Sequence, residues 1–159
     1  MSTNANASSL TVISDLEIAM TRVFDASREL VFKAYTDPEM VAQWWGQRAS
    51  TTIVDKLDLR PGGTWRFIQR EEGGIEYAFN GEYREVSPPE RLVSTFEFEM
   101  MPGHVIVDTA TFEELDGRTK VTVTSLFANI EDRDGMLSSG MEGGANESWD
   151  QLAELLATN

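Results

Sequence analysis

The chain has 159 residues, of which 13 are basic and 27 are acidic, and its formal net charge at pH 7 is −14. This acidity makes nucleic acid and anionic membrane surfaces poor partners, because both repel a negatively charged protein. The sequence contains no cysteine, which excludes disulfides, thiolate metal sites and thiol nucleophiles. No stretch approaches the roughly 20 apolar residues of a membrane-spanning helix.

The length fits a single domain that buries about two-thirds of its unfolded surface in one core. Residues 1–9 form a polar leader of mainly Ser, Asn and Ala, with neither a basic start nor an apolar block. It therefore does not resemble a secretory signal, and a cytoplasmic location is expected. We expect this leader to be flexible, or to pair at the contact of a homodimer, and residues 10–159 to form the domain.

A strand and two short helices are predicted first. Residues 16–24 alternate between apolar and polar side chains and are rich in strand formers. Ser27 is suited to cap a helix, which the Asp37-Pro38 pair ends. Pro38 begins a second helix, and Gly46 ends it.

From Ser50 onward the apolar pattern changes to a period of two, which is typical of strands. Turn residues such as Arg-Pro-Gly-Gly at 60–63 and Asp-Gly at 116–117 separate these segments. Successive strands joined by short turns form an antiparallel meander. The six predicted strands cover residues 52–59, 64–69, 77–86, 91–99, 105–114 and 120–126.

Residues 128–159 have the length and polarity pattern of one closing helix, because their apolar or small side chains recur at spacings of three and four. Gly140, Gly143 and Gly144 each cost about 1 kcal/mol relative to alanine in a helix interior. Either the backbone passes close to a neighbour at these glycines, or the helix kinks there. The first alternative places the glycine face beside a pocket.

The order of these elements predicts an α+β fold in which a curved antiparallel sheet receives a long C-terminal helix. Such a sheet can bury the helix only in its concave face. This arrangement leaves room for a cavity between sheet and helix, and the many aromatic residues would line it. We interpret the segment 44–46, Trp-Trp-Gly, in one of two ways: its rings close the mouth of that cavity, or they simply pack in the core.

Few residues could support catalysis or metal binding. His104 is the only histidine, which excludes a site with several histidine ligands, and its neighbours supply no nucleophile. Asp108 shares strand parity with inward-facing residues, so it is either a buried acid paired with Arg66 or Arg84, or an edge residue open to water. Glu82 and Glu85 could approach Asp108 as a carboxylate pair, but with 27 acidic residues chance proximity is the stronger explanation. No glycine motif for phosphate binding is present.

Four segments in a fixed order closely resemble one bacterial family. They read DASRELVFKAYTDPEMVAQWWG at 25–46, DLRPGGTWRF at 58–67, GEYREVSPPERLV at 81–93 and SGMEGGANESWDQLAELL at 139–156. The family comprises homologues of the activator of the ninety-kilodalton heat-shock protein ATPase, within the START-like, or birch-pollen-allergen-like, helix-grip superfamily. The resemblance spans about residues 16–156 and implies the helix-grip fold with a cavity for apolar ligands such as lipids, sterols or polyketides. Where this family usually has histidine or serine on the last strand, this chain has Ser125, which implies a polar wall.

The leading hypothesis is a non-enzymatic protein that binds a small hydrophobic molecule, without a metal, cofactor or catalytic set. One alternative is a chaperone-associated interaction protein with an exposed patch on the outer face of the sheet. Another is an enzyme, such as a cyclase or hydrolase, that uses Asp108 or Glu82 on an apolar substrate. The residues expected to face the pocket are Trp44, Trp65, Phe67, Phe96, Asp108, Ala110, Phe112, Val123, Met136, Gly140 and Met141.

Overall fold

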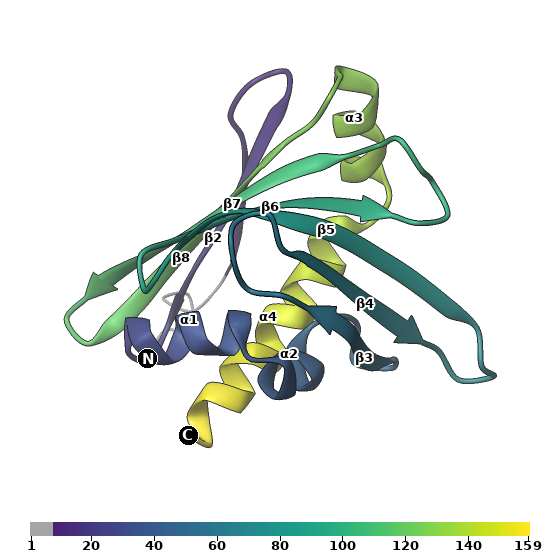
Figure 1. Cartoon of the computed structure of the whole chain (residues 1–159). Helices are drawn as coiled ribbons and strands as arrows, with labels where there is room; N and C mark the ends of the chain where they lie inside the picture. The colour runs from purple at the N-terminus through teal and green to yellow at the C-terminus, as the bar shows by residue number, and fades with distance from the viewer. Residues whose placement is uncertain (1–7) are drawn as a thin grey trace.

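A curved antiparallel sheet of eight strands forms the frame of the protein, in the order β1-β2-β8-β7-β6-β5-β4-β3 (Figure 1). The computed structural model describes residues 8–159, so residues 1–7 of the predicted leader lie outside the described part. The strands are β1 (Ser9–Val12), β2 (Glu17–Phe24), β3 (Thr51–Leu57), β4 (Thr64–Arg70), β5 (Glu76–Ser87), β6 (Arg91–Phe98), β7 (Ile106–Leu115) and β8 (Arg118–Leu126).

The predicted meander is confirmed from β3 to β8, where each strand pairs with the next one along the chain. The first predicted strand, β2, pairs with β8. β1 was not predicted, because its four residues adjoin the polar leader and are too few to show a period. It extends the sheet beyond β2, with Leu10 opposite Met20.

Two short helices follow β2 and lie at one end of the sheet (Figure 1). In α1 (Arg28–Thr36), the Ser27 hydroxyl accepts a hydrogen bond from the Leu30 N–H at 3.3 Å. In α2 (Pro38–Trp44), the Asp37 carboxylate accepts one from the Glu39 N–H at 2.9 Å. Both caps satisfy amide groups that the first turn of a helix leaves without partners. The predicted starts of the two helices are thus confirmed.

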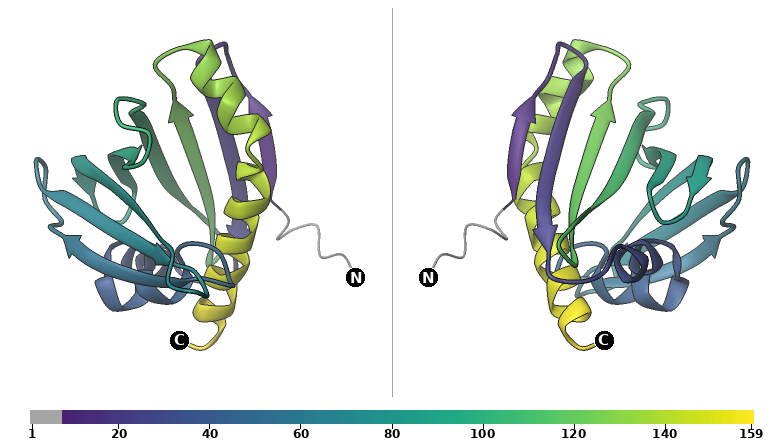
Figure 2. Two further views of the ribbon diagram at one scale, coloured as in Figure 1. Left: turned by 90° about the vertical axis from the view of Figure 1, so that its right-hand side faces the viewer. Right: turned by 90° about the vertical axis from the view of Figure 1, so that its left-hand side faces the viewer.

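The C-terminal segment consists of two helices, α3 (Ile130–Ser138) and α4 (Met141–Ala157). Of the two alternatives for the glycines, a kink or break in the helix is confirmed, and α4 is the long C-terminal helix. The break lies at Gly140, whose φ of 85° is left-handed, a conformation that glycine adopts without the penalty other residues have. None of the residues of α3 is buried. α4 lies along the concave side of the sheet and buries Trp149, Leu152 and Leu156 (Figure 2).

The predicted glycine face does not border a pocket. Gly140 and Gly143 are exposed, and a Cβ atom at either position would meet nothing within 4 Å. A Cβ at Gly144 would meet only the Gln47 side chain, at 4.0 Å. Close approach of the backbone therefore does not explain these glycines, and the helix break explains only Gly140.

The main core joins the sheet to α1, α2 and α4. Phe24 of β2 packs against the edge of Trp149, with ring centroids 5.7 Å apart. The Trp149 indole donates a hydrogen bond to the Tyr35 hydroxyl at 2.9 Å, and Arg22 pairs with Asp150 at 2.7 Å. These contacts fix α4 against both β2 and α1, so the helix is held from two sides.

Two alanine substitutions test the helix break. Gly140→Ala should lower the free energy of unfolding by about 1–2 kcal/mol, since an L-residue is strained at this left-handed φ. Gly143→Ala should raise it by about 0.5–1 kcal/mol, because that exposed helical position has room for a methyl group. Both values can be measured by urea denaturation. If the two substitutions changed the free energy of unfolding by the same amount in the same direction, the break at Gly140 would be contradicted.

Candidate functional site

A pocket of about 110 Å³ lies between the concave face of the sheet and the two short helices. No residue of α3 or α4 lines it. The pocket therefore lies beside α1 and α2, whereas the prediction placed the cavity under the C-terminal helix. Its lining is mostly aromatic and aliphatic. The lining residues are Tyr35, Val41, Trp44, Trp45, Trp65, Phe67, Tyr83, Leu92, Ser94, Phe96, Asp108, Ala110 and Val123.

This pocket is lined by most of the residues that the strand alternation predicted to face inward. Alternate residues of β4, β6, β7 and β8 share the concave face of the sheet. The register brings them together directly: Ala110 of β7 is opposite Val123 of β8 and Leu92 of β6. The residues shared by the prediction and this lining are Trp44, Trp65, Phe67, Phe96, Asp108, Ala110 and Val123.

The other four predicted residues lie elsewhere. Phe112 is 1% exposed and packs against the rings of Phe32 and Tyr35 at 5.3 and 5.2 Å. Met136 and Met141 pack against a second cluster formed by Ile18, Ile106 and Phe127. Gly140 is exposed at the helix break, and no neighbour approaches it within 4 Å.

Sequence reasoning missed several lining residues. Strand parity could have found Leu92 and Ser94, since they alternate with Phe96 along β6. Tyr35 could not be found in this way, because the face that a short helix turns toward a sheet depends on tertiary packing. Trp45, which the sequence placed either at the mouth of the cavity or in the core, follows the last residue of α2 and lines the pocket, with its ring 5.1 Å from Phe67.

Asp108 is the only carboxylate among the lining residues. It lies opposite Ser94 of β6 and Ser125 of β8, and the Ser125 hydroxyl donates a hydrogen bond to its Oδ1 atom at 2.6 Å. Burial raises the pKa of Asp108 to about 6, and the hydrogen bond from Ser125 opposes this rise. The carboxyl group therefore titrates close to neutral pH.

The predicted arginine partners of Asp108 are engaged elsewhere. Arg66 binds Glu99 at 2.8 Å and Asp55 at 3.3 Å, and Arg84 lies 4.0 Å from Glu82. Both arginines occupy strand positions that alternate with the concave face, so their side chains project from the outer side of the sheet. Side chains alternate between the two faces along each strand, so Asp108 faces the concave side of the sheet while Arg66 and Arg84 face the outer side.

The remaining polar groups of the pocket are hydroxyls. Burial raises the pKa of Tyr35 above its ordinary value; the hydrogen bond from Trp149 opposes this rise, and the charge of Asp108 adds to it. Burial also raises the pKa of Tyr83. Both phenols therefore stay protonated at neutral pH, and Ser94 provides a further hydroxyl.

The other candidate chemical groups are dispersed. The side chains of Glu82 and Glu85 are 50% and 42% exposed and contact Arg84 and Arg91, so they form no carboxylate pair with Asp108. His104 is exposed, with its Nδ1 atom 2.8 Å from the Asp132 carboxylate. Among residues 8–159, no group of three His, Cys, Asp or Glu side chains could hold a metal ion.

The segment after α2 holds one wall of the pocket in place. The Gly46 N–H donates to the Ser148 hydroxyl at 2.9 Å, and the Gln151 amide donates to the Gly46 carbonyl at 2.8 Å. Trp45 precedes this junction and packs edge-on against Phe67 and Phe79. The bonds of α4 to Gly46 therefore hold Trp45 in the pocket wall, although no residue of α4 lines the pocket.

The burial of Asp108 should make stability depend on pH. Its ordinary pKa is 3.8 and its folded value is about 6, so the folded state binds more protons between these values and loses stability as pH rises through them. Asp108→Asn should therefore stabilise the protein more at pH 7.5 than at pH 4, by up to about 3 kcal/mol. Urea denaturation at both pH values measures this difference.

Glu113→Gln is the matched control, because it removes an exposed carboxylate from the same strand. An equal effect of Asp108→Asn at the two pH values would show that Asp108 is ionised as readily in the folded as in the unfolded chain.

Proteins of known structure share this fold. A protein from Rhodobacter sphaeroides is 22% identical, with a TM-score of 0.90 over 96% of this chain and 100% of that chain. One from Mycobacterium smegmatis is 26% identical, with a TM-score of 0.81 over 93% of this chain and 97% of that one. A protein from Chromobacterium violaceum is also 26% identical, with a TM-score of 0.80 over 90% and 98% of the respective chains.

No curated protein matches the chain. Within residues 8–159, none of the helices has both the length and the apolar character needed to cross a membrane. The family model described as "Activator of Hsp90 ATPase homolog 1-like protein" matches residues 25–157, which includes both short helices, β3 to β8 and almost all of the C-terminal helical segment. The resemblance predicted from the four sequence segments is confirmed, and the chain belongs to this family.

Proposed function

We propose that the protein binds a small molecule with an apolar body and one polar group in the pocket between the sheet and the two short helices. The observation that carries this proposal is the chemistry of the lining, in which one half-buried carboxylate and a few hydroxyls lie among aromatic rings. Ligand sites commonly combine an apolar wall with a small number of polar groups that orient the ligand.

The size of the pocket limits its occupant. Its volume of about 110 Å³ is below the roughly 300–1,000 Å³ of ordinary ligand pockets. A cavity of about 150 Å³ holds benzene, and this pocket is smaller, so a molecule of about one ring is its upper limit unless the wall moves. A lipid or sterol would need the wall to move.

A row of partly buried rings offers an extension of the pocket. Phe96 lines the pocket, Phe79 stacks on Phe96 with centroids 5.5 Å apart, and Phe98 stacks on Phe79 at 5.0 Å. Tyr77 continues the row at 6.1 Å from Phe98. A ligand with a longer apolar body could lie along these rings while its polar group reaches Asp108.

Titration with benzyl alcohol tests the proposal, because this probe has one ring and one hydroxyl. NMR amide shifts should change at pocket residues on β6, β7 and α2. Ala110→Leu, which fills the pocket, should weaken binding about tenfold or more by removing the space for the ring. Thr109→Leu, on the opposite face of the same strand, should leave the affinity unchanged.

Shift changes far from the pocket, or equal affinity of Ala110→Leu and the unmodified protein, would refute binding at this site. Native mass spectrometry of the protein purified from its own host would report the mass of the natural ligand.

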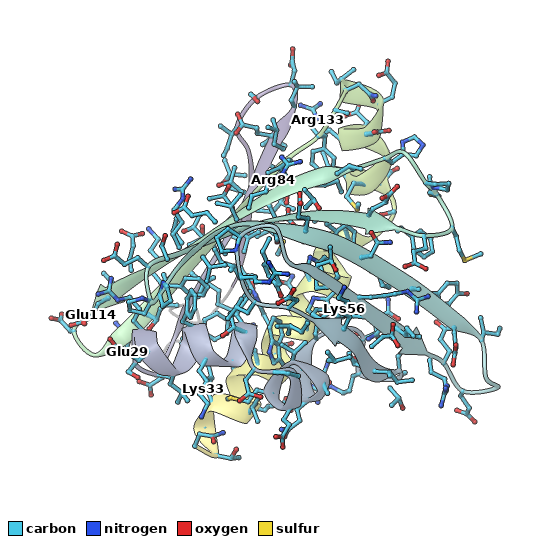
Figure 3. All side chains as sticks on the ribbon, viewed as in Figure 1. Glu29, Lys33, Lys56, Arg84, Glu114 and Arg133 are labelled. Carbon is cyan, nitrogen blue, oxygen red and sulfur yellow. The ribbon has the colours of Figure 1, made fainter. Side chains whose placement is uncertain are left out.

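A second candidate function is interaction with a chaperone, which the family description and one exposed surface favour. Large apolar side chains gather on three connections near one end of the sheet, and we call this surface the apolar end. Arg133 of α3, which is labelled in Figure 3, donates to the Ser14 carbonyl at 2.8 Å. His104 contacts Asp132 of α3, so α3 links two of these connections. The apolar end comprises Val12, Ile13, Leu16, Met100, Met101, Val105, Leu126 and Ile130.

Exposed apolar surface of this kind marks contact sites for other proteins, and methionine adapts readily to varied partners. The side chains of Met100 and Met101 are 66% and 55% exposed. The surface lies on loops at the end of the sheet, whereas the alternative hypothesis placed it on the outer face.

An ATPase assay with a bacterial Hsp90 tests this second function. The unmodified protein should stimulate ATP hydrolysis, and the double substitution Met100→Ser, Met101→Ser should reduce the stimulation several-fold by removing apolar contact area. Ile75→Ser is the control, because Ile75 is 56% exposed on the β4–β5 turn, away from the apolar end. Absence of stimulation at saturating protein would rule out this function.

A further inference from the structure

We propose that the ligand of the pocket is a protonated organic amine, whose ammonium group pairs with Asp108 while its apolar body lies against the aromatic rings. This inference rests on the proposed function, ligand binding in the pocket, and adds the chemical class of the ligand.

The first argument is the charge of the lining. Asp108 is its only carboxylate, and no lysine, arginine or histidine lines the pocket. Within the described chain, the one hydrogen bond to this carboxylate comes from Ser125 and reaches Oδ1, so Oδ2 has no protein donor. Asp108 is half-buried, and a carboxylate that is partly withdrawn from water without a cation beside it is unfavourable. A ligand that carries a positive charge would supply the missing partner.

Nearby cations do not fill this role. Arg22, which also projects from the concave face, is paired with Asp150 of α4 at 2.7 Å and lies over the Phe24 ring at 5.3 Å. Arg66 is held by Glu99 on the outer side. Both guanidinium groups have carboxylate partners of their own, which leaves Asp108 for a ligand.

The second argument is the number of acceptors around Asp108. An ammonium group has up to three N–H donors. The groups that face Asp108 from the surrounding elements are hydroxyls: Tyr35 from α1, Ser94 from β6 and Ser125 from β8. The oxygens of Tyr35 and Ser94 can accept hydrogen bonds, and the Tyr35 oxygen already accepts one from Trp149. The pocket thus offers a carboxylate and neutral acceptors to a single donor group.

The third argument is the aromatic wall. Trp45, Trp65 and Phe67 lie with their centroids 4.6 to 6.4 Å from one another, and Trp44 and Phe96 complete the ring-rich lining. Aromatic rings attract cations through their electron-rich faces, and tryptophan does so most strongly. An anionic ligand would be repelled by Asp108 and by the electron-rich faces of these rings.

The response to pH separates an amine from a neutral ligand. The pKa of Asp108 is about 6, raised by burial, so the carboxylate is mostly ionised at pH 7.5 and mostly protonated at pH 5. A bound ammonium stabilises the ionised form, and by linkage its affinity falls as pH falls. A ligand that accepts a hydrogen bond from the protonated carboxyl would show the opposite trend.

Calorimetric titration with benzylammonium, benzyl alcohol and benzoate tests the inference, since the three probes share one ring and differ in charge. At pH 7.5 benzylammonium should bind about tenfold or more tightly than benzyl alcohol, and benzoate should bind most weakly. At pH 5 the advantage of benzylammonium should shrink, although the amine itself stays protonated. Asp108→Asn should abolish this advantage.

Glu113→Gln is the control for the general negative charge of the protein, and it should leave the preference for benzylammonium intact. Equal affinity for benzylammonium and benzyl alcohol at pH 7.5 would overturn the inference while ligand binding in the pocket stands. Absence of binding by all three probes would overturn both. If Asp108→Asn does not fold, the pH dependence of the unmodified protein still decides between an ammonium and a neutral ligand.

Discussion

The junction at Gly46 is the constraint on which the rest of the concave side depends. Its N–H and carbonyl both bond to α4, through Ser148 and Gln151. Its φ of 101° is left-handed, and a Cβ atom there would overlap the Gln69 side chain of β4. Only glycine satisfies both conditions. One residue therefore joins the end of α2, the middle of α4 and a strand on the far side of the sheet.

This junction determines where the pocket can form. α4 rests near β2 and β8 and contacts α1 and α2, while β3 to β5 curve away from it (Figure 2). The space beneath the curved strands is filled by the aromatic side chains of β4 to β6 and by Trp45, which the Gly46 junction holds in place. The hollow that remains is small because these rings pack against one another, with several pairs of centroids near 5 Å. A curved sheet with fewer aromatic residues would leave a larger cavity.

The sequence allowed the strands and the inward-facing residues to be predicted, because strand periodicity is local and each face of a sheet has its own polarity. It did not reveal the partner of Asp108, since cross-strand register decides which side chains meet. That register places serines on both sides of Asp108. The sequence also left the role of the glycines open, because glycines in a helical pattern indicate either close packing or a change of conformation. The left-handed φ of Gly140 is a property of the folded chain.

The pocket and α3 are connected through the ring of Phe96. Phe96 lines the pocket and also packs against the second cluster, to which Ile18, Ile106 and Phe127 belong. That cluster contacts Met136 of α3 and Met141 at the start of α4. Because packed interiors transmit displacements, a displacement of Phe96 would reach α3 and the start of α4 through this cluster. α4 has further supports along its length, through Gly46, Arg22 and Tyr35.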